Sequence, residues 1–493
     1  MLFPVRTRDL VVLLTCFLVH LAFRNKRKRL LRLPPGPVRW PIIGNALMVP
    51  ATYVHKFYKK LSEDLGSKII YLECLKQPII VISDFNIARE LLEKRSALYS
   101  SRPPFTMTNE VIGFNCLLSM MPYGDRWRLH RRILIQNLSE KNIPEIREKV
   151  LDFIRKGLLS NVLQNPDNIR EHLANTIGGF SLSMTYGTPV QRQRDPLVHF
   201  AEEVFNNLLG AGAPSKYMVN VIAPLKYIPE WFPGSGFKKE AKKIRSQLDH
   251  LMEEPFRETM GKMDQGTAIP CFVTQALERG DSTDLDHEQY VQCIKEIGVE
   301  IFSALFETTF VPLMTFFLVM QKYPEVQRKA QEEVDFVVGY DRLPDFSDIP
   351  HLKFISCVVK ELFRWNPIVP IGVPHATTEE DVYMGYYIPK GSIVVPNSYA
   401  MLQDEQTFPE PEKFMPERFI ASDGGLRDDI IDPEFFVTFG FGRRICPGAS
   451  IARSTIYITI ASLLHLFNVS PALDAEGKPV DFQPKFRPSS VTS

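Results

Sequence analysis

The residues around Cys446 carry the clearest chemical signal in the chain. Residues 439–448 read Phe-Gly-Phe-Gly-Arg-Arg-Ile-Cys-Pro-Gly and are followed by an apolar stretch, Ala449–Leu466, which we expect to be a helix. Pro447 suits its first turn, so Cys446 lies at a helix N-terminus, where the dipole and free N–H groups stabilise a thiolate. The glycines permit close approach of a bulky planar ligand. The pattern therefore predicts a ligating cysteine rather than an inert one.

A second candidate for chemistry interrupts the apolar stretch Ile294–Lys322, which we also expect to be a helix. Within it, Glu307 is followed directly by Thr308. An acid beside an alcohol is a pair of groups that relays protons, and polar groups inside an apolar helix indicate burial and function. Pro312 deletes the hydrogen bond to the carbonyl four residues earlier, which belongs to Thr308, so we expect a bend there.

Three further arrangements are weak signals when taken singly. Trp127 and Arg131 are one helical turn apart and share a face, which suits a clamp on an anionic group. Glu361 and Arg364 also share one helix face, although most such pairs are solvated surface bridges. A lone histidine such as His375 is usually a satisfied polar group. Their meaning depends on the rest of the chain.

Together these motifs resemble the cytochrome P450 family, over residues 34 to about 484. The run ending at Gly448 matches every fixed position of the family pattern F-x-x-G-x-R-x-C-x-G. The resemblance implies a mainly α fold with small β-sheets, haem b (iron protoporphyrin IX) as the cofactor and Cys446 as the iron ligand. It also implies that the haem is held by Phe439, Arg444, Gly448, Trp127, Arg131 and His375.

On the other side of the haem, the resemblance assigns proton delivery for oxygen activation to Glu307 and Thr308. Leu305 departs from the pattern, which has glycine there, and the bend expected from Pro312 would compensate. Glu361 and Arg364, together with Arg418, resemble the family's structural Glu–Arg–Arg triad.

The implied reaction is oxidation, typically hydroxylation, of an apolar small molecule by a haem-thiolate monooxygenase that uses O₂. Electrons from NADPH would come through a separate NADPH–cytochrome P450 reductase. Residues 225–234 and Val373-Pro-His375 resemble fungal members of secondary metabolism, although a xenobiotic substrate remains an alternative. Basic residues that are candidates for docking the reductase are Arg126, Arg128, Arg132 and Arg443.

Two other interpretations stay open at this point. One is a haem-thiolate isomerase or dehydratase that never activates oxygen, which Leu305 favours and the intact Glu307–Thr308 pair opposes. The other is a haem-binding but inactive paralogue. Its motivation is Leu305 together with a C-terminus at Ser493, earlier than the family pattern leads us to expect.

Composition narrows the class of protein further. The chain has 493 residues, of which 45% are hydrophobic, and a formal net charge of +1. A large core is therefore possible, whereas a nucleic-acid partner is disfavoured because such proteins are normally basic. The seven cysteines, an odd and scattered set, do not form a disulfide framework and indicate a reducing compartment.

The N-terminus predicts a membrane anchor. Leu10–Phe23 is uncharged and apolar, and a dense basic cluster follows it within residues 24–32. A helix over this run rises about 21 Å, short of a bilayer core of about 30 Å, so a signal peptide or an interfacial helix remains an alternative. We expect residues 1–33 to be a single-pass anchor in the endoplasmic reticulum membrane and residues 34–493 to be the catalytic domain, facing the cytoplasm.

The elements that must position these residues are mostly helical. Residues 140–323 have a helical pattern that glycine and proline interrupt near 210–236. Strand-like segments are Lys68–Leu72, Pro78–Ser83 and Val382–Pro396, the last with turn signals at 384–385 and 390–391. We find no repeat or linker that separates a second globular domain.

Overall fold

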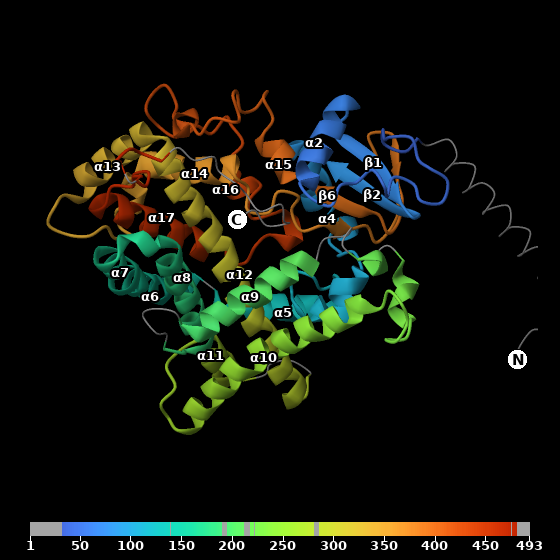
Figure 1. The fold of residues 1–493 in the computed structure, drawn as a ribbon, viewed down its shortest axis with the longest axis horizontal. Helices are drawn as coiled ribbons and strands as arrows, with labels where there is room; N and C mark the ends of the chain where they lie inside the picture. Colours follow the sequence, from blue (N-terminus) through green and yellow to red (C-terminus); the bar gives the residue numbers. More distant parts are fainter. Residues whose placement is uncertain are drawn as a thin grey trace, which may run out of the picture.

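The computed structural model describes residues 32–138, 140–189, 195–211, 217–220, 222–280, 285–474 and 476–480. Residues 1–31, which include the whole apolar run Leu10–Phe23, and residues 481–493 lie outside these ranges. The fold is mainly α with small sheets, as predicted (Figure 1). The α-helices are α2 Val54–Asp64, α3 Phe85–Arg89, α4 Ser96–Tyr99, α5 Asp125–Asn137, α6 Ile143–Asp152, α7 Ser160–Gln164, α8 Ile169–Tyr186, α9 Pro196–Ala211, α10 Gly236–Asp264, α11 Phe272–Arg279, α12 His287–Lys322, α13 Pro324–Val338, α14 Lys353–Trp365, α15 Ser398–Leu402, α16 Pro433–Phe436 and α17 Ala449–Leu466.

Short π- and 3₁₀-helical turns connect and extend these helices. Near the predicted break at 210–236 the described chain forms two 3₁₀ turns, and α10 begins only at Gly236. The π turns are η1 Glu90–Lys94, η2 Thr106–Ile112 and η5 Phe153–Leu159, and the 3₁₀ turns are η3 Phe114–Cys116, η4 Glu140–Asn142, η6 Pro166–Asn168, η7 Met218–Asn220, η8 Ala223–Tyr227, η9 Ile349–His351, η10 Pro416–Phe419 and η11 Gly442–Arg444.

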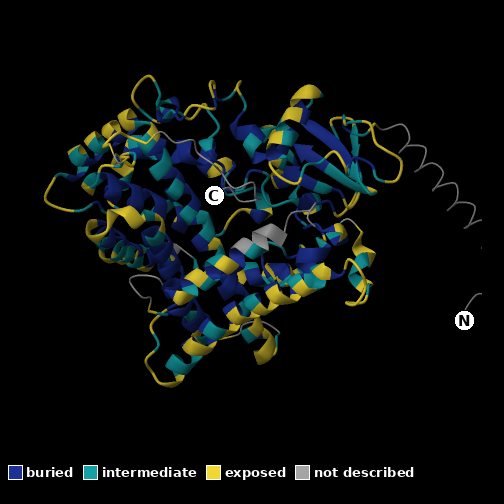
Figure 2. Ribbon diagram, in the orientation of Figure 1, coloured by how far each residue is buried: buried dark blue, intermediate teal, exposed yellow. Residues whose placement is uncertain are grey.

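Helix α12 runs through the middle of the molecule (Figure 1). The Asp286 side chain caps its start by accepting a hydrogen bond from Gln289 N, and Tyr323 and Pro324 end it. It packs against α8, α10, α11 and α17. Because it is surrounded by other helices, it is apolar around most of its circumference and is largely buried (Figure 2).

Two described helices, α12 and α17, are long and apolar enough to cross a membrane. In their most apolar windows, however, 61% and 72% of the residues are buried inside the protein. Both helices contribute residues to the largest hydrophobic core, as core helices of a globular domain do.

The predicted strands at 68–72 and 78–83 form β1 Ile69–Cys74 and β2 Gln77–Ile82, an antiparallel hairpin. The chain returns to this hairpin much later, because β6 Ile393–Pro396 pairs with β2 in parallel and β3 His375–Ala376 pairs with β6 antiparallel. The order of the four-stranded sheet is therefore β1-β2-β6-β3. This crossover brings residues near 394 beside residues near 80, and His375 lies one strand further out, beside Val394.

The segment predicted as strand-like with two turns, Val382–Pro396, forms three short strands, the first of which begins one residue earlier. β4 Asp381–Tyr383 and β5 Tyr386–Ile388 form a two-stranded sheet, and β6 follows after a second turn. The turns fall where the sequence predicts them, with positive φ at Met384 and at the glycines 385 and 391.

Candidate active site

The loop that carries Cys446 folds back on itself immediately before α17. The Cys446 N–H donates to the Phe439 carbonyl over 2.8 Å, which closes the loop. Gly442 has a φ of +55°, and a Cβ atom there would lie 2.3 Å from the Leu92 carbonyl oxygen. Only glycine fits this approach, so the loop can pack against η1 and hold the cysteine in place.

Cys446 lines a cavity between this loop and α12. The empty volume of the cavity and its mouth is about 1560 Å³. Burial raises the pKa of the Cys446 thiol, and the Gly448 backbone N–H opposes this rise by favouring the thiolate. A metal cation bound at the sulfur would deprotonate the thiol outright. Among the described residues, no group of three or more His, Cys, Asp or Glu side chains could hold a metal ion.

Helix α5 places Trp127 and Arg131 on the cavity wall, one turn apart as predicted. The guanidinium carbon of Arg131 lies 5.8 Å from the Trp127 ring centroid, and that of Arg444 lies 4.6 Å from it. The buried indole is therefore flanked by two cations, and these contacts fix its orientation.

Arg444 is held by backbone carbonyls rather than by an acid. Its guanidinium donates to the carbonyls of Ser100, Leu118 and Met121 over 2.8, 3.1 and 2.7 Å. Burial and the neighbouring charge of Arg131 lower the pKa of Arg444 to about 10. The three acceptors are neutral, so the charge of Arg444 is offset by Glu300 without an ion pair between them.

His375 lies on β3 and also lines the cavity. Its Nδ1 lies 2.7 Å from the Tyr99 carbonyl, which accepts the Nδ1 hydrogen. Burial and the charge of Arg102 lower the pKa of His375 well below its ordinary value. In the neutral ring Nε2 is then an acceptor, so donation to an anion requires a protonated imidazole. The role of His375 as a donor stays a prediction.

Arg102 is a functional candidate that the sequence did not reveal. It lines the same cavity and donates from Nε to Ser119 O and from one terminal nitrogen to the carbonyls of Val373 and Pro374. Burial and the charge of Arg444 lower its pKa well below the ordinary value. Since it lies in an irregular loop, no motif or helical spacing marks it.

These cations make the cavity suitable for a dianion with an apolar body. Arg102, Arg131 and Arg444 form no ion pair within the described ranges, and most other lining side chains are apolar. A haem supplies two carboxylates, a flat apolar ring and an iron atom, so the residues present fit this group.

Helix α12 forms the wall that faces Cys446. Ala304, Leu305 and Thr308 line the cavity, and the Thr308 hydroxyl donates to the Ala304 carbonyl over 2.6 Å. The helix stays α-helical through Pro312. Glu307 is half-buried but is not among the lining residues, because consecutive helical residues point about 100° apart. Direct proton delivery from Glu307 therefore stays a prediction.

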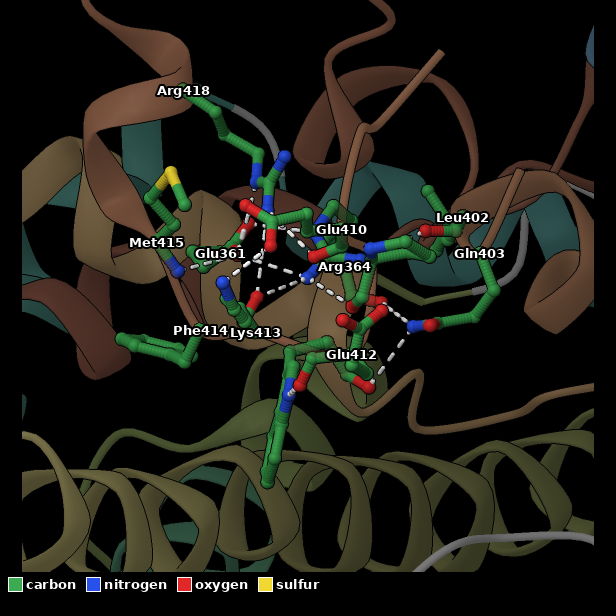
Figure 3. Close-up of polar contacts among 12 residues, drawn as sticks. Glu361, Arg364, Leu402, Gln403, Glu410, Glu412, Lys413, Phe414, Met415 and Arg418 are labelled. Carbon is green, nitrogen blue, oxygen red and sulfur yellow. Dashed lines mark hydrogen bonds and ion pairs between the residues drawn. The ribbon is translucent and has the colours of Figure 1, made fainter. Parts of the chain in front are cut away.

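Glu361 lies at the centre of a separate network that stabilises the fold (Figure 3). It accepts two bonds from Arg364, at 2.7 and 2.9 Å, and one from Arg418 at 3.1 Å. The Met415 N–H donates to it over 2.8 Å, while Arg364 also donates to the carbonyls of Leu402 and Pro411. None of these atoms lines the cavity. The geometry agrees with the structural role that the sequence predicted for these residues.

Comparison with known proteins agrees with this geometry. Residues 34–490 match the model of the family described as Cytochrome P450. Cytochrome P450 monooxygenase ple1 of Rhodocybe pseudopiperita is 37% identical over 93% of this chain and 87% of its own length. Cytochrome P450 monooxygenase COX2 of Coprinopsis cinerea is 36% identical over 93% and 86%. A tryptamine 4-monooxygenase of Psilocybe cyanescens is 36% identical over 94% and 91%.

These similarities favour an oxygenase over the isomerase, dehydratase and inactive-paralogue interpretations, because the named relatives are monooxygenases that match almost end to end. Membership also implies a haem cofactor, a redox partner and a small-molecule substrate. The chain belongs to the cytochrome P450 family and is a haem-thiolate monooxygenase.

Proposed function

We propose that the cavity binds haem b, with Cys446 as the iron ligand and the carboxylates at the end formed by Arg102, Arg131 and Arg444. The observation that carries this proposal is the set of three arginines without an acidic partner among the described residues, in the same cavity as the thiol. Trp127 and His375 complete that end of the cavity. Phe439 and Gly448 line the cavity beside the thiol.

The bound haem would supply the activation of O₂, and the residues of the chain would control its surroundings. Thr308 holds a hydroxyl hydrogen on the cavity wall, directed to the Ala304 carbonyl. A rotation about its χ1 angle would turn this hydroxyl toward the cavity and hand over a proton there. Glu307 would act one step further away, by restoring the proton to Thr308.

The substrate would be a small, largely apolar molecule, which Leu305, Ile368 and Val369 would contact. Several relatives are fungal enzymes, which supports a role in fungal secondary metabolism or in the oxidation of xenobiotics. Apolar walls exclude water, and water exclusion favours reaction with substrate over side reactions.

Electrons would come from NADPH–cytochrome P450 reductase, docked near the surface arginines of α5 and the Cys446 loop. Arg128 and Arg443 flank Tyr123, with guanidinium carbons 5.4 and 5.3 Å from its ring centroid. Arg132 is exposed beside them, while Arg126 pairs with Glu296. An exposed cationic patch near the iron ligand suits an acidic electron donor.

The chain would be anchored to the endoplasmic reticulum membrane by a single span within residues 1–33, leaving 34–493 as the catalytic domain in the cytoplasm. Exposed apolar side chains support a membrane beside this domain. Trp40 is 70% exposed, and Trp231 in another segment is 81% exposed. Both segments lie toward the same end of the long axis of the molecule (Figure 1). Tryptophan and tyrosine are enriched at membrane–water interfaces.

The test of the proposal is the absorption spectrum of the ferrous–carbonyl complex. The wild-type protein should show the red-shifted band that thiolate ligation produces, and Cys446→Ala should lose it. Cys357→Ala, which changes a buried cysteine away from the cavity, is the matched control and should keep the band. A folded, haem-loaded wild-type protein without the shifted band would contradict thiolate ligation.

A further inference from the structure

Glu300 is a buried acid on the cavity wall that the proposed chemistry does not use. It lies on α12 and is 9% exposed. Among the described residues that line the cavity it is the only acidic one. Since burying a carboxylate is costly unless it is paired, its presence in a largely apolar wall requires an explanation.

The protein satisfies this carboxylate only in part. One oxygen accepts the Ser119 backbone N–H over 3.1 Å, and the other accepts the Ser119 hydroxyl over 3.3 Å. Two carboxylate oxygens offer about four acceptor positions, so about two remain. Glu300 has no ion pair with any described residue, and nearby Arg102 directs its hydrogen bonds to the carbonyls of Ser119, Val373 and Pro374.

The protonation state of Glu300 depends on its burial and on the charged groups near it. Burial raises its pKa, whereas the hydrogen bonds from Ser119 and the charges of His130 and Arg102 oppose that rise. A cation in the cavity would favour the carboxylate further, because opposite charges attract strongly where water is excluded.

Position along α12 connects Glu300 to the reactive end of the cavity. Glu300, Ala304 and Thr308 are spaced by four residues and all line the cavity. The rise of 1.5 Å per residue puts Glu300 about 12 Å from Thr308 along the axis. A molecule with a cationic end at Glu300 would extend its apolar part past Ala304 toward Thr308 and Cys446.

We propose that Glu300 binds the ammonium group of a basic amine substrate and so selects amines with an apolar skeleton for oxidation. This inference rests on the proposed function, since it names a substrate class for the same cavity. A second reading is that Glu300 only fixes the segment around Ser119. The two readings differ in whether the charge of Glu300 is needed.

Glu300→Gln separates them, because glutamine keeps an acceptor for the Ser119 N–H and removes the charge. The probes are N,N-dimethyl-2-phenylethylamine, which is a cation at neutral pH, and its uncharged carbon isostere isopentylbenzene. Equilibrium dialysis against the haem-loaded enzyme measures both affinities. We expect wild-type enzyme to prefer the amine, and Glu300→Gln to weaken amine binding about tenfold or more without weakening isostere binding. Glu300→Asp, which keeps the charge, should retain the preference.

Three results would overturn the proposal: a wild-type enzyme without preference for the amine, a Glu300→Gln enzyme with unchanged amine affinity, or an equal loss for both probes. The last would identify Glu300 as a fixing residue for Ser119. The ferrous–carbonyl spectrum of the same preparations reports separately on thiolate ligation. A shifted band together with any of these three results would reject the amine site and leave the monooxygenase assignment intact.

Discussion

Two groups of buried charged side chains in this protein differ in whether the chain itself supplies an acidic partner for the cations. Around Glu361, two guanidinium groups and one carboxylate pair with each other, and backbone carbonyls accept further hydrogen bonds from both guanidinium groups. On the cavity wall, Arg131 and Arg444 have no acidic partner among the described residues. In the first set both guanidinium groups contact a carboxylate of the chain, whereas in the second an anion from outside the chain would have to supply that contact.

The contrast gives a criterion for reading buried charges in this fold. A closed network, such as the one around Glu361, has an acidic partner for its cations within the chain. Such a network should affect the stability of the chain whether or not a ligand is bound. An open set, such as Arg131 and Arg444, lacks an acidic partner among the described residues. Such a set should affect the retention of the ligand more than the stability of the chain. Helix α5 contains both kinds, because Arg131 faces the cavity while His130 is buried against Glu296.

The largest effect is expected from opening the closed network. Glu361→Ala leaves Arg364 and Arg418 buried without their carboxylate and should cost about 3–5 kcal/mol of the free energy of unfolding. Thermal or urea unfolding of the haem-loaded protein measures it. Glu332→Ala is the matched control, since Glu332 pairs with Arg328 on the surface and both side chains are 62% exposed. The control should change stability by at most about 0.5 kcal/mol. Equal effects of the two variants would contradict the comparison.

A pH-dependent effect on stability is expected from His130 and its partner Glu296, which form a second closed network. His130 is fully buried; its Nε2 lies 2.8 Å from a Glu296 oxygen, which Arg126 also contacts. Burial alone would lower the pKa of His130, but its bonds to Cys293 and Glu296 outweigh burial and raise it to about 9. Because the folded pKa exceeds the ordinary 6.5, this contribution is complete below pH 6.5 and is lost as the pH rises through about 9.

The amplitude of this contribution is at most about 3 kcal/mol. Urea unfolding at several pH values between 6 and 10 should show the difference between wild type and His130→Phe shrinking as the pH rises. His287→Phe, which changes an exposed histidine at the start of α12, is the control and should leave the pH profile unchanged. A wild-type advantage that grows toward pH 10 would contradict a protonated His130.

Removing a cation of the open set should weaken haem retention rather than the stability of the chain. Arg131 stacks on Trp127 but forms no hydrogen bond or ion pair with any described residue, so its removal costs the chain little. We expect Arg131→Met to accelerate transfer of haem to apomyoglobin about tenfold, which corresponds to about 1.4 kcal/mol. Arg132→Met is the control on the next, exposed position of α5 and should leave the rate unchanged. Unchanged transfer in Arg131→Met would remove this residue from the haem site.

The buried charges also differ in how far the sequence predicts their partners. Glu361 and Arg364 are one helical turn apart, so their pairing follows from local geometry. Arg102 and Glu300 gain their meaning only from the segment around Ser119, which contacts both of them. No local spacing encodes that contact, and the sequence analysis therefore missed both residues.

Proton delivery by Glu307 and Thr308 stays a prediction, but helix geometry limits how the two residues can share it. Glu307 and Thr308 are adjacent, and adjacent residues on a helix cannot point in the same direction. The structure accordingly places Thr308 but not Glu307 on the cavity wall. The strands β1 and β2, by contrast, were predicted to within two residues because continuous runs of β-branched and aromatic residues mark them locally, whereas β3 was not predicted.

The smallest effect is expected at Pro312, where no charge is involved. Pro312 lies inside α12 and has no N–H to donate to the Thr308 carbonyl. Leu305 lines the cavity one turn before Thr308, on the side where substrate and oxygen must fit. Pro312→Ala would restore the missing bond, draw the helix straighter and press Leu305 into the cavity.

We expect Pro312→Ala to lower the amount of product formed per NADPH consumed about twofold, which is about 0.4 kcal/mol. Leu305→Gly should recover part of the loss in the double variant, because sites that act on the same helix turn need not behave additively. Measuring all four proteins of this cycle isolates the coupling between the two residues. If Pro312→Ala leaves coupling unchanged, the proline does not compensate for Leu305, and the space beside Thr308 must be set by the packing of α12 against α8 and α17 instead.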